Sequence, residues 1–293
     1  MSALPSAQPA FQIRKATPAD VEVCGRICHQ AFATINKEHN FPPDVPTPEM
    51  GIQVIGWMFS NPEFYCVVAE INGQPVGSNC LDERGPIAGI GPITIDPKVQ
   101  NQGIGRALMQ AVMDRSQERG FAGVRLVQAA FHSRSMSLYT KLGFLVREPL
   151  IVMQGRPRTK SISGVTVRAA TQADLPRCDD LCERVNGHHR SGEVRDGIAH
   201  GAAKVAERNG RIVAYTSGLA FFGHSVAETT EDLCALIASA DGFGGPGILL
   251  PTRNHELFNW CLHNGLKVVE PMTLMTTGLY NEPRGAYLTS VSF

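Results

Sequence analysis

Short apolar runs alternate with amphipathic stretches along the first half of the chain. Runs with strand spacing, bounded by turn residues, predict strands at 11–15, 64–70, 75–81, 87–95 and 124–130, and another from 144 onward. Apolar positions recurring at helical spacing predict helices at 18–32, 50–59, 103–119 and 135–142. This order of elements predicts an α+β (mixed α/β) sheet with helices on both faces.

The chain repeats its own pattern. Residues 14–28 read RKATPADVEVCGRIC and residues 168–182 read RAATQADLPRCDDLC, and they match without a gap at Arg, Ala, Thr, Asp and Cys positions. Both read as the start of a helix with Thr17 or Thr171 at the N-cap and Asp20 or Asp174 at the third helical position.

Two further pairs of similar segments follow in the same order, NGQPVG with NGRIVA and KLGF with HNGL. The stretch 154–164, QGRPRTKSISG, has the composition of an exposed linker. We therefore predict two copies of one fold, with domains at 1–153 and 165–293 joined by a linker at 154–164.

Composition supports a globular protein with a substantial core. The chain has 293 residues, of which 43% are hydrophobic and 18% charged, and Lys+Arg and Asp+Glu are equal at 27. This balance of charges gives no excess of positive charge that would favour binding to nucleic acid or to an anionic membrane. No segment approaches the ~20 apolar residues of a spanning helix, and Met1–Ala10 lacks the pattern of a secretory signal. We expect a soluble, cytoplasmic protein with free thiols.

The residues with the clearest predicted chemical role lie in the stretch GPITIDPKVQNQGIGRALMQAVMDR. A strand at Ile93, Thr94 and Ile95 leads through a turn to Gly103 and Gly105 at the start of an amphipathic helix. Glycines leave the backbone amides bare at a helix N-terminus, where the dipole favours an anion, so a pyrophosphate fits here. The alternative is a glycine turn that merely starts a helix. A third glycine is missing, which excludes the dinucleotide fingerprint.

These motifs resemble those of the GNAT (N-acetyltransferase) superfamily. Gln100-x-x-Gly103-x-Gly105 after a strand is similar to its acyl-CoA signature. The segment SLYTKLGF, at Ser137–Phe144, resembles its last helix, and the strand GVRLVQAA lies between the two motifs. The resemblance covers residues 11–153. It implies two tandem GNAT-like domains, each a mostly antiparallel twisted sheet flanked by helices, of which the second is a diverged copy.

The resemblance also implies an activity. In this superfamily an amine attacks the thioester of acetyl-CoA directly in a ternary complex, with no acyl-enzyme and no metal. The expected acceptor is a primary amine of a small molecule or peptide. The residues implied to bind the donor are Ile93, Thr94, Ile95, Gln100, Asn101, Gln102, Gly103, Ile104, Gly105 and Arg106.

Two further residues are candidates for catalysis. The resemblance places Tyr139 where a tyrosine protonates the departing thiolate, although core packing beside Leu138 and Leu142 is the alternative. His132 follows the strand and is a candidate contact to a water or the pantetheine, or a base, although a lone histidine there is more often structural. Asp82 and Glu83 are weaker candidates for the base, which stays unassigned.

The second copy lacks the Gln-x-x-Gly-x-Gly motif, and Cys261 stands where Tyr139 is expected. The acidic residues Glu228, Glu231 and Asp232 would repel a diphosphate unless they cap the helix. We therefore expect this copy not to bind acyl-CoA.

Three questions stay open at this point. Paired cysteines, Cys24 with Cys28 and Cys178 with Cys182, suggest a metal site, but core packing is favoured because cysteine is often buried. A non-catalytic acyl-CoA sensor is the competing function. The acyl chain, the acceptor and a possible homodimer stay open, with His39–Pro48 and Asn186–Arg195 expected on family analogy to line the acceptor site.

Overall fold

The computed structural model describes residues 11–292, so the interpretation of Met1–Ala10 falls outside the described residues. The chain forms two compact units, which we call the first unit (Met1–Asp82 with Ile90–Gly120) and the second unit (Glu83–Gly89 with Phe121–Phe293). These units differ from the predicted division at 154–164, which stays a prediction. No described helix is both long and apolar enough to cross a membrane.

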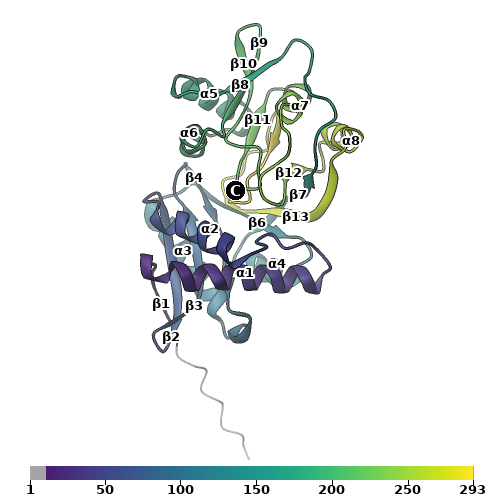
Figure 1. The fold of residues 1–293 in the computed structure, drawn as a ribbon. Helices are drawn as coiled ribbons and strands as arrows, with labels where there is room; N and C mark the ends of the chain where they lie inside the picture. The colour runs from purple at the N-terminus through teal and green to yellow at the C-terminus, as the bar shows by residue number, and fades with distance from the viewer. Residues whose placement is uncertain (1–10, 293) are drawn as a thin grey trace, which may run out of the picture. The chain divides into compact units, whose positions relative to one another are not determined.

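The first unit is an antiparallel sheet with helices packed on it (Figure 1). Its elements are β1 (Phe11–Lys15), α1 (Val21–Glu38), α2 (Pro48–Ser60), β2 (Phe64–Ile71), β3 (Gln74–Asp82), β5 (Thr94–Ile95) and α3 (Ile104–Arg119), with short 3-10 turns at Pro18–Asp20 and Pro97–Val99. Helices α1 and α2 pack closely where they cross. A Cβ added at Gly51 would collide with the carbonyl oxygen of Gly25, so the glycine permits this close approach. Cys24 and Cys28 are buried in the cluster between them.

Two predictions about these and the neighbouring elements need correction. The helix predicted to end at residue 32 continues to Glu38, and its last turn is held by Asn36, whose amide donates to the carbonyl of Pro42 at 2.7 Å. The strand predicted at 87–95 is two strands, β4 (Ile87–Ile90) and β5. Gly91, with φ 139°, and Pro92 interrupt it, since proline has no amide hydrogen for the sheet.

The second unit contains two sheets. Its strands after β4 are β6 (Gly123–Ala129), β7 (Leu145–Gln154), β8 (Thr166–Ala169), β9 (Lys204–Arg208), β10 (Arg211–Thr216), β11 (Ser225–Ala227), β12 (Ile248–Pro251), β13 (Lys267–Gly278) and β14 (Ala286–Leu288). Its helices are α4 (Ser133–Lys141), α5 (Leu175–Asn186), α6 (Ser191–Ala199), α7 (Thr230–Ala238) and α8 (His255–His263), with a 3-10 turn at Gln172–Asp174. One sheet runs β14-β11-β10-β9-β8, and the other contains β6-β13-β7-β12.

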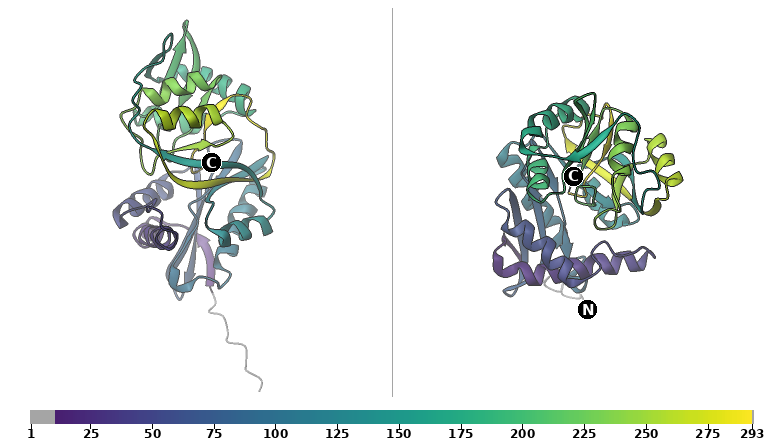
Figure 2. Two further views of the ribbon diagram at one scale, coloured as in Figure 1. Left: turned by 90° about the vertical axis from the view of Figure 1, so that its right-hand side faces the viewer. Right: turned by 45° about the horizontal axis from the view of Figure 1, so that its top comes forward.

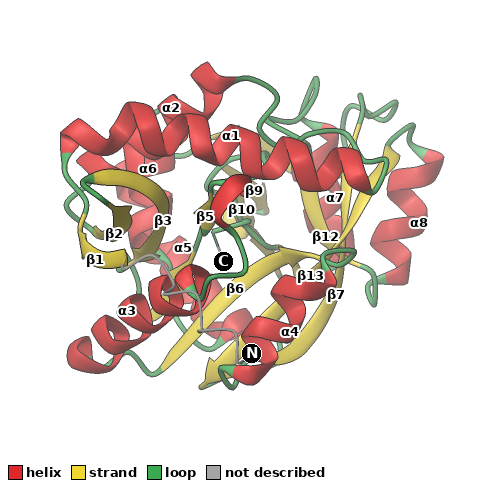
Figure 3. Cartoon of the chain, turned by 90° about the horizontal axis from the view of Figure 1, so that it is seen from below, coloured by secondary structure: helices red, strands yellow, loops and turns green. Residues whose placement is uncertain are grey.

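The sheet β6-β13-β7-β12 contains strands from both predicted copies, in alternation (Figure 3). In the repeat, β6 corresponds to β12 and β7 corresponds to β13, because each pair flanks the matching helices α4 and α8. Yet β13 pairs with β6 along Met272–Gly278, and β7 pairs with β12 along Leu150–Met153. The strand that follows the matching helix in each copy, β7 or β13, therefore pairs with a strand of the other copy, and the two compact units do not follow the repeat.

In the ladder between β7 and β12, Ile248 lies opposite Met153 and Pro251 lies opposite Leu150, so the two strands run antiparallel. Strand β13 also pairs antiparallel with β7, from Lys267 opposite Gln154 to Thr276 opposite Leu145. The exchanged strand β13 is thus bonded on both edges, which is how a strand is most firmly held in a sheet.

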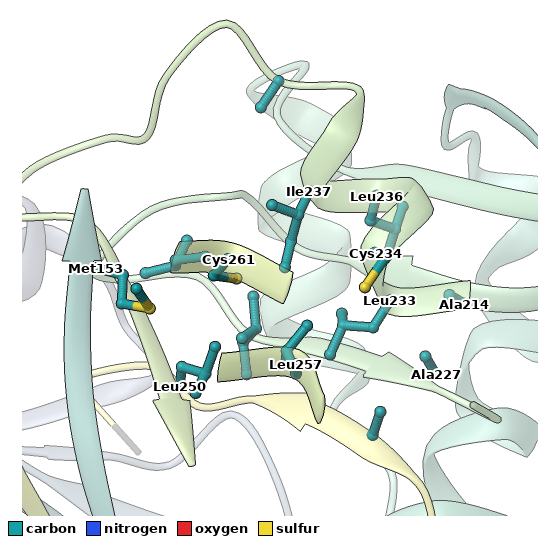
Figure 4. Packing of buried hydrophobic residues seen from close by; sticks show 14 of the residues in the cluster. Met153, Ala214, Ala227, Leu233, Cys234, Leu236, Ile237, Leu250, Leu257 and Cys261 are labelled. Atoms are coloured by element: carbon teal, nitrogen blue, oxygen red, sulfur yellow. The ribbon is translucent and has the colours of Figure 1, made fainter. Parts of the chain in front are cut away.

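Helices α7 and α8 cover the core of the second unit and lie side by side in the left view of Figure 2. Their apolar faces meet strands of both sheets, as Leu233, Ile237 and Leu257 show in Figure 4. Cys261 is fully buried in the same cluster. The position aligned with Tyr139 in the second copy is therefore a core residue.

The predicted helix starts are confirmed in both copies. In the first, Thr17 caps the turn and the Arg14 guanidinium donates two hydrogen bonds of 2.8 Å to the Asp20 carboxylate. In the second, Thr171 caps the turn and Arg168 makes the same two bonds, also 2.8 Å, to Asp174. Identical side chains in identical geometry support the interpretation of the chain as a repeat.

Candidate functional site

The turn between β5 and α3 is built from local hydrogen bonds in the first unit. The Asp96 carboxylate accepts a hydrogen bond of 2.9 Å from the amide of Lys98, and the Gln100 amide donates to the carbonyl of Ile95 at 3.4 Å. Asn101 and Gly103 both have positive φ, 66° and 85°. Glycine, which has no Cβ, and asparagine, with its short polar side chain, tolerate this region, so the sequence allows the sharp turn that leads into the helix.

The N-terminus of α3 is open. Gly103 is the N-cap, and among the described residues no side chain caps the helix there. By contrast, Thr47 caps α2 and Asn254 caps α8. A Cβ added at Gly103 would meet no described atom within 4 Å. The first amides of α3 therefore point out of a positive helix end that no side chain of the described chain covers.

Other polar groups of this segment are also available to a ligand. Arg106 is exposed in the first turn of α3, which contains no acidic residue. The hydroxyl of Thr94 and the side-chain oxygen of Gln102 are buried and have no hydrogen-bond partner in the described part of the chain. An open helix end, a nearby cation and unsatisfied polar atoms form a setting suited to a diphosphate and its polar arm.

Tyr139 and His132 lie in the second unit, at helix α4, and Ser135 interacts with both. The Ser135 hydroxyl lies 2.7 Å from Nδ1 of His132, and the Ser135 side chain acts to lower the pKa of the Tyr139 phenol. Tyr139 is 5% exposed, and burial raises the pKa of its phenol to about 12. The phenol is consequently protonated at neutral pH, as a proton donor must be.

Tyr139 also has the packing expected of a core residue. Its ring meets Phe144 edge to face at 6.3 Å between centroids, and its carbonyl accepts the amide of Phe144 at 3.0 Å. Packing fixes the ring, while the hydroxyl keeps a polar partner. The two interpretations of Tyr139 are thus compatible within one geometry.

The candidate residues divide between the units. The residues from Ile93 to Arg106 belong to the first unit, whereas Tyr139 and His132 belong to the second. Asp82 is the last residue of β3 and is only 8% exposed, so it does not lie in a solvated turn.

The matching helix of the second copy, α7, has a closed N-terminus. The Thr229 hydroxyl accepts a hydrogen bond from the amide of Asp232 at 3.2 Å and donates to its carboxylate at 2.6 Å. Arg208 then pairs with Asp232 at 2.9 Å and with Glu231 at 3.1 Å. Of the three acidic residues predicted either to repel an anion or to cap the helix, Asp232 takes part in the cap, while Glu231 pairs with Arg208 and Glu228 pairs with Arg211.

A strand of the chain also fills the region beside α7. Strand β14 pairs antiparallel with β11, and Thr289, just after it, bridges to Leu249 of β12. The place between β11 and β12 is thus taken by the chain itself.

Cys178 and Cys182 lie in a neighbouring apolar cluster, and burial raises the pKa of Cys178 to about 12. Residues 11–292 hold no group of side chains suited to a metal ion.

The sequence interpretation missed several buried charges of the second unit. His224 is fully buried, with Nδ1 3.0 Å from the Glu193 carboxylate and Nε2 3.0 Å from the Tyr215 hydroxyl. Arg125 and Glu148 lie inside strands β6 and β7 and are 6% and 2% exposed. A charged residue within an apolar run, as in GVRLVQAA, is the signal by which Arg125 could have been found.

Comparison with known proteins agrees with this geometry. Residues 32–144 match the model of the acetyltransferase (GNAT) family. A mycothiol acetyltransferase from Nocardia farcinica is 40% identical over 63 residues, which are 22% of this chain and 21% of that protein. An uncharacterized N-acetyltransferase from Methanocaldococcus jannaschii is 30% identical over 99 residues, 31% of this chain and 44% of that protein. The chain thus aligns with less than half the length of these relatives.

Two solved structures share the fold over nearly the whole chain. A putative acetyltransferase from Pyrococcus horikoshii superposes with a TM-score of 0.72 and 19% identity, covering 98% of this chain and 96% of that one. A tandem GNAT protein from the clavulanic acid biosynthesis pathway gives a TM-score of 0.55 and 14% identity, covering 92% and 98%. Residues 32–144 therefore match the acetyltransferase (GNAT) family model, and the chain shares the mixed α/β fold of these solved structures.

Proposed function

We propose that the chain transfers an acetyl group from acetyl-CoA to a primary amine of a small molecule or peptide. The observation that carries this proposal is the uncapped N-terminus of α3 at Gly103. Bare amides at a positive helix end suit the diphosphate of the coenzyme, with Arg106 beside them. The remaining proposed donor-binding residues lie on the same segment, which the GNAT family model covers.

The proposed reaction is a direct transfer. The backbone of Ile93, Thr94 and Ile95 holds the pantetheine arm, and one amide there polarises the thioester carbonyl. The amine nitrogen attacks the carbonyl carbon, a tetrahedral intermediate forms, and the carbon–sulfur bond breaks as the carbonyl returns. Tyr139 gives its proton to the departing thiolate, and the new amide nitrogen loses a proton to a base that stays unassigned.

Tyr139 needs a route by which it regains its proton. Ser135, whose hydroxyl lies 2.7 Å from Nδ1 of His132 and whose side chain acts on the pKa of Tyr139, supplies such a route within α4 and the residue that precedes it. In this proposal His132 is a positioning residue and proton relay, and Tyr139 is the catalytic acid.

The second copy is proposed to bind no acyl-CoA. Its helix α7 is capped by Thr229 and Asp232, and its own C-terminal strand β14 takes the place beside β11. A carboxylate in the first turn would also repel a diphosphate.

The experiment that tests the proposed function compares two substitutions at one position. Asparagine tolerates the positive φ of Gly103, and aspartate has nearly the same shape but adds a negative charge. We expect Gly103→Asp to weaken acetyl-CoA binding about tenfold or more relative to Gly103→Asn, because the carboxylate opposes the diphosphate at the helix end. Isothermal titration calorimetry measures both dissociation constants.

Gly120, at the other end of α3, provides the matched control, since it also has a positive φ and open space around its Cβ. Gly120→Asp and Gly120→Asn should bind acetyl-CoA alike. Equal affinity of Gly103→Asp and Gly103→Asn would contradict the proposed site. Coenzyme binding without thiol release in a broad panel of amines would instead favour the acyl-CoA sensor.

A further inference from the structure

Strand β1 is the outermost strand of its sheet (Figure 1). Strand β2 pairs with one of its edges, and no strand within residues 11–292 pairs with the other. The open edge of a strand presents unpaired amides and carbonyls, which are a template for pairing with another chain. The first unit, to which β1 and β2 belong, therefore has a backbone surface on which a further strand fits.

One hydrogen bond identifies the backbone groups on this edge. The amide of Ala16, the residue after β1, donates to the carbonyl of Cys66 in β2 at 2.9 Å. Residues of an antiparallel ladder alternate between pairs that exchange hydrogen bonds and pairs that do not. The amides and carbonyls of Phe11, Ile13 and Lys15 therefore point away from β2, to the open edge.

A groove of about 350 Å³ lies between α3 and the strands β1 and β2. Ile13, Val67 and Ala111 supply its apolar lining, and Tyr65 adds an aromatic ring. Lys15 lines the same groove, so the groove borders the face of β1 that carries the side chains of the outward-facing residues. Its volume is at the lower end of the range for ligand pockets, so it suits one bulky side chain rather than a large ligand.

The groups on the open edge are placed symmetrically about Ile13. When β1 of a second copy pairs antiparallel about Ile13, the two Ile13 residues lie opposite each other, and each Phe11 lies opposite Lys15 of the other copy. Every outward amide and carbonyl then has a partner, and the two-fold axis closes the assembly at two chains. The Lys15 carbonyl accepts a bond of 3.3 Å from Arg14 within its own chain and has a second lone pair for this pairing.

The same register fills the groove. Alternate residues of a strand share a face, so Phe11 points to the same side as Ile13 and Lys15. Phe11 of the second copy, opposite Lys15, is thus placed at the groove with its ring toward Val67 and Tyr65. Phe11 and Ile13 are both partly exposed in the single chain, and the pairing removes part of their apolar surface from water.

The charges of β1 permit this pairing. Arg14 points to the other face, where its guanidinium is held by Asp20 at 2.8 Å and by Glu70 at 2.7 Å. Lys15 lies opposite an uncharged ring, and the acidic Glu118 of α3 lines the same groove. Like charges directly opposite each other would destabilise a strand pair, and this register places none between the two β1 strands.

We propose that two copies of the chain form a reversible dimer by antiparallel pairing of their β1 strands about a two-fold axis at Ile13, with Phe11 of each copy in the groove of the other. This interface is independent of the proposed function, because it uses neither the acyl-CoA segment nor Tyr139. Two paired strands of five residues bury less surface than a permanent dimer needs, so the dimer should dissociate on dilution.

Cysteine substitution tests both the pairing and its register. In a hydrogen-bonded antiparallel pair the two Cα atoms are about 5.5 Å apart, which is within the range of a disulfide. We expect diamide, which takes up the hydrogens of two thiols, to link Ile13→Cys into a covalent dimer that is seen on a non-reducing gel. The native cysteines are all buried and should not compete.

Gln12→Cys is the matched control. Gln12 is more exposed than Ile13, so random collision would cross-link a thiol there faster. In the proposed register, however, two thiols at position 12 lie diagonally across the strand pair, beyond the reach of a disulfide. Cross-linking of Gln12→Cys as fast as Ile13→Cys would overturn the inference, and so would the absence of a covalent dimer from folded Ile13→Cys.

Sedimentation velocity over a concentration series measures the dimer without a covalent link. We expect Ile13→Lys to raise the dissociation constant of the dimer about tenfold or more, because two ammonium groups would then lie directly opposite each other on the two-fold axis. Thermal melting verifies that the variant is folded.

Val23→Lys is the control for added charge, since Val23 is an apolar residue of α1 that is 39% exposed. It should leave the dissociation constant unchanged. A wild-type chain that stays monomeric at every attainable concentration, or a dimer that Ile13→Lys does not weaken, would overturn the inference.

Discussion

Tyr139 combines a buried ring with a hydroxyl, and this combination determines what removal of the hydroxyl should do. Replacing it with phenylalanine keeps the packing against Phe144 and removes only the hydroxyl, which is the proposed proton donor. We expect Tyr139→Phe to lower kcat about 100-fold while acetyl-CoA affinity stays within about twofold of wild type. Steady-state kinetics and calorimetry on the same preparation measure the two quantities.

The pH dependence gives a second check on Tyr139. Burial raises the pKa of the phenol to about 12, so in the wild-type protein the proposed acid should stay protonated between pH 7 and pH 10. Ser135→Ala is the matched variant, because it removes the link to His132 and leaves the phenol in place. An unchanged kcat in Tyr139→Phe would remove the tyrosine from the mechanism.

Single residues differ in how far the sequence predicts them. Thr17 and Asp20 are read correctly because a capping box is local, and the structure confirms it. Arg125 is visible as a charge in an apolar strand, but nothing local says that Tyr280 stacks on it. The two residues lie far apart in the chain, and only the strand pairing brings them together.

At the scale of elements, helices α3 and α7 differ in whether a side chain caps their N-termini. Gly103 leaves α3 open, while Thr229 and Asp232 close α7. We therefore expect calorimetry to give a stoichiometry of one acetyl-CoA per chain. Two sites would contradict the proposed closure of the second copy, and Gly103→Asp locates the single site by weakening it.

The repeated capping turn predicts a dependence of stability on pH. The Arg14 guanidinium and the Thr17 hydrogen bonds lower the pKa of Asp20 to about 2, below the usual value of about 3.9. Its contribution is therefore complete above about pH 5 and is lost as the pH falls toward 2. We expect Asp20→Asn to cost roughly 1–2 kcal/mol at pH 7, discounted because Arg14 is partly exposed.

Denaturant unfolding of Asp20→Asn and wild type at pH 7 and at pH 3 measures this difference, which should shrink at the lower pH. The second copy offers an independent replicate, because Arg168 also lowers the pKa of Asp174. Glu22→Gln, at an exposed pair in the first turn of α1, is the control and should change stability little. A cost of Asp20→Asn that does not vary with pH would contradict the linkage.

Helices and strands are predicted well where the apolar positions recur with a regular period, and less well at their ends. The helix that continues to Glu38 is held by the contact of Asn36 with Pro42, which no spacing rule contains. The strand predicted at 87–95 breaks at Gly91 and Pro92, where the residues themselves carry the reason. The order of strands in the sheet could not be predicted, because strands with similar apolar patterns can pair in several ways.

At the scale of the whole molecule, the exchange of β7 and β13 makes the two halves of the repeat depend on each other. Without residues 165–293, β6 would lose β13, and β7 would lose both β12 and β13. Unpaired strands expose backbone donors and apolar side chains, which favours aggregation over folding. A fragment ending at the predicted linker should therefore show no cooperative unfolding transition.

Cleaving the intact protein tests the same dependence without removing any strand. Ser163 and Gly164 are exposed in the linker, so a protease site inserted between them should be cut in the folded protein. We expect the two cleaved pieces to elute together in size-exclusion chromatography and to melt in one transition, because the antiparallel ladders of β13 with β6 and of β12 with β7 join them. The matched control carries the same site after Asn72, in the hairpin turn between β2 and β3 of the first unit. Pieces that separate after the linker cut into two folded monomers would show that each copy keeps its own last strand in solution.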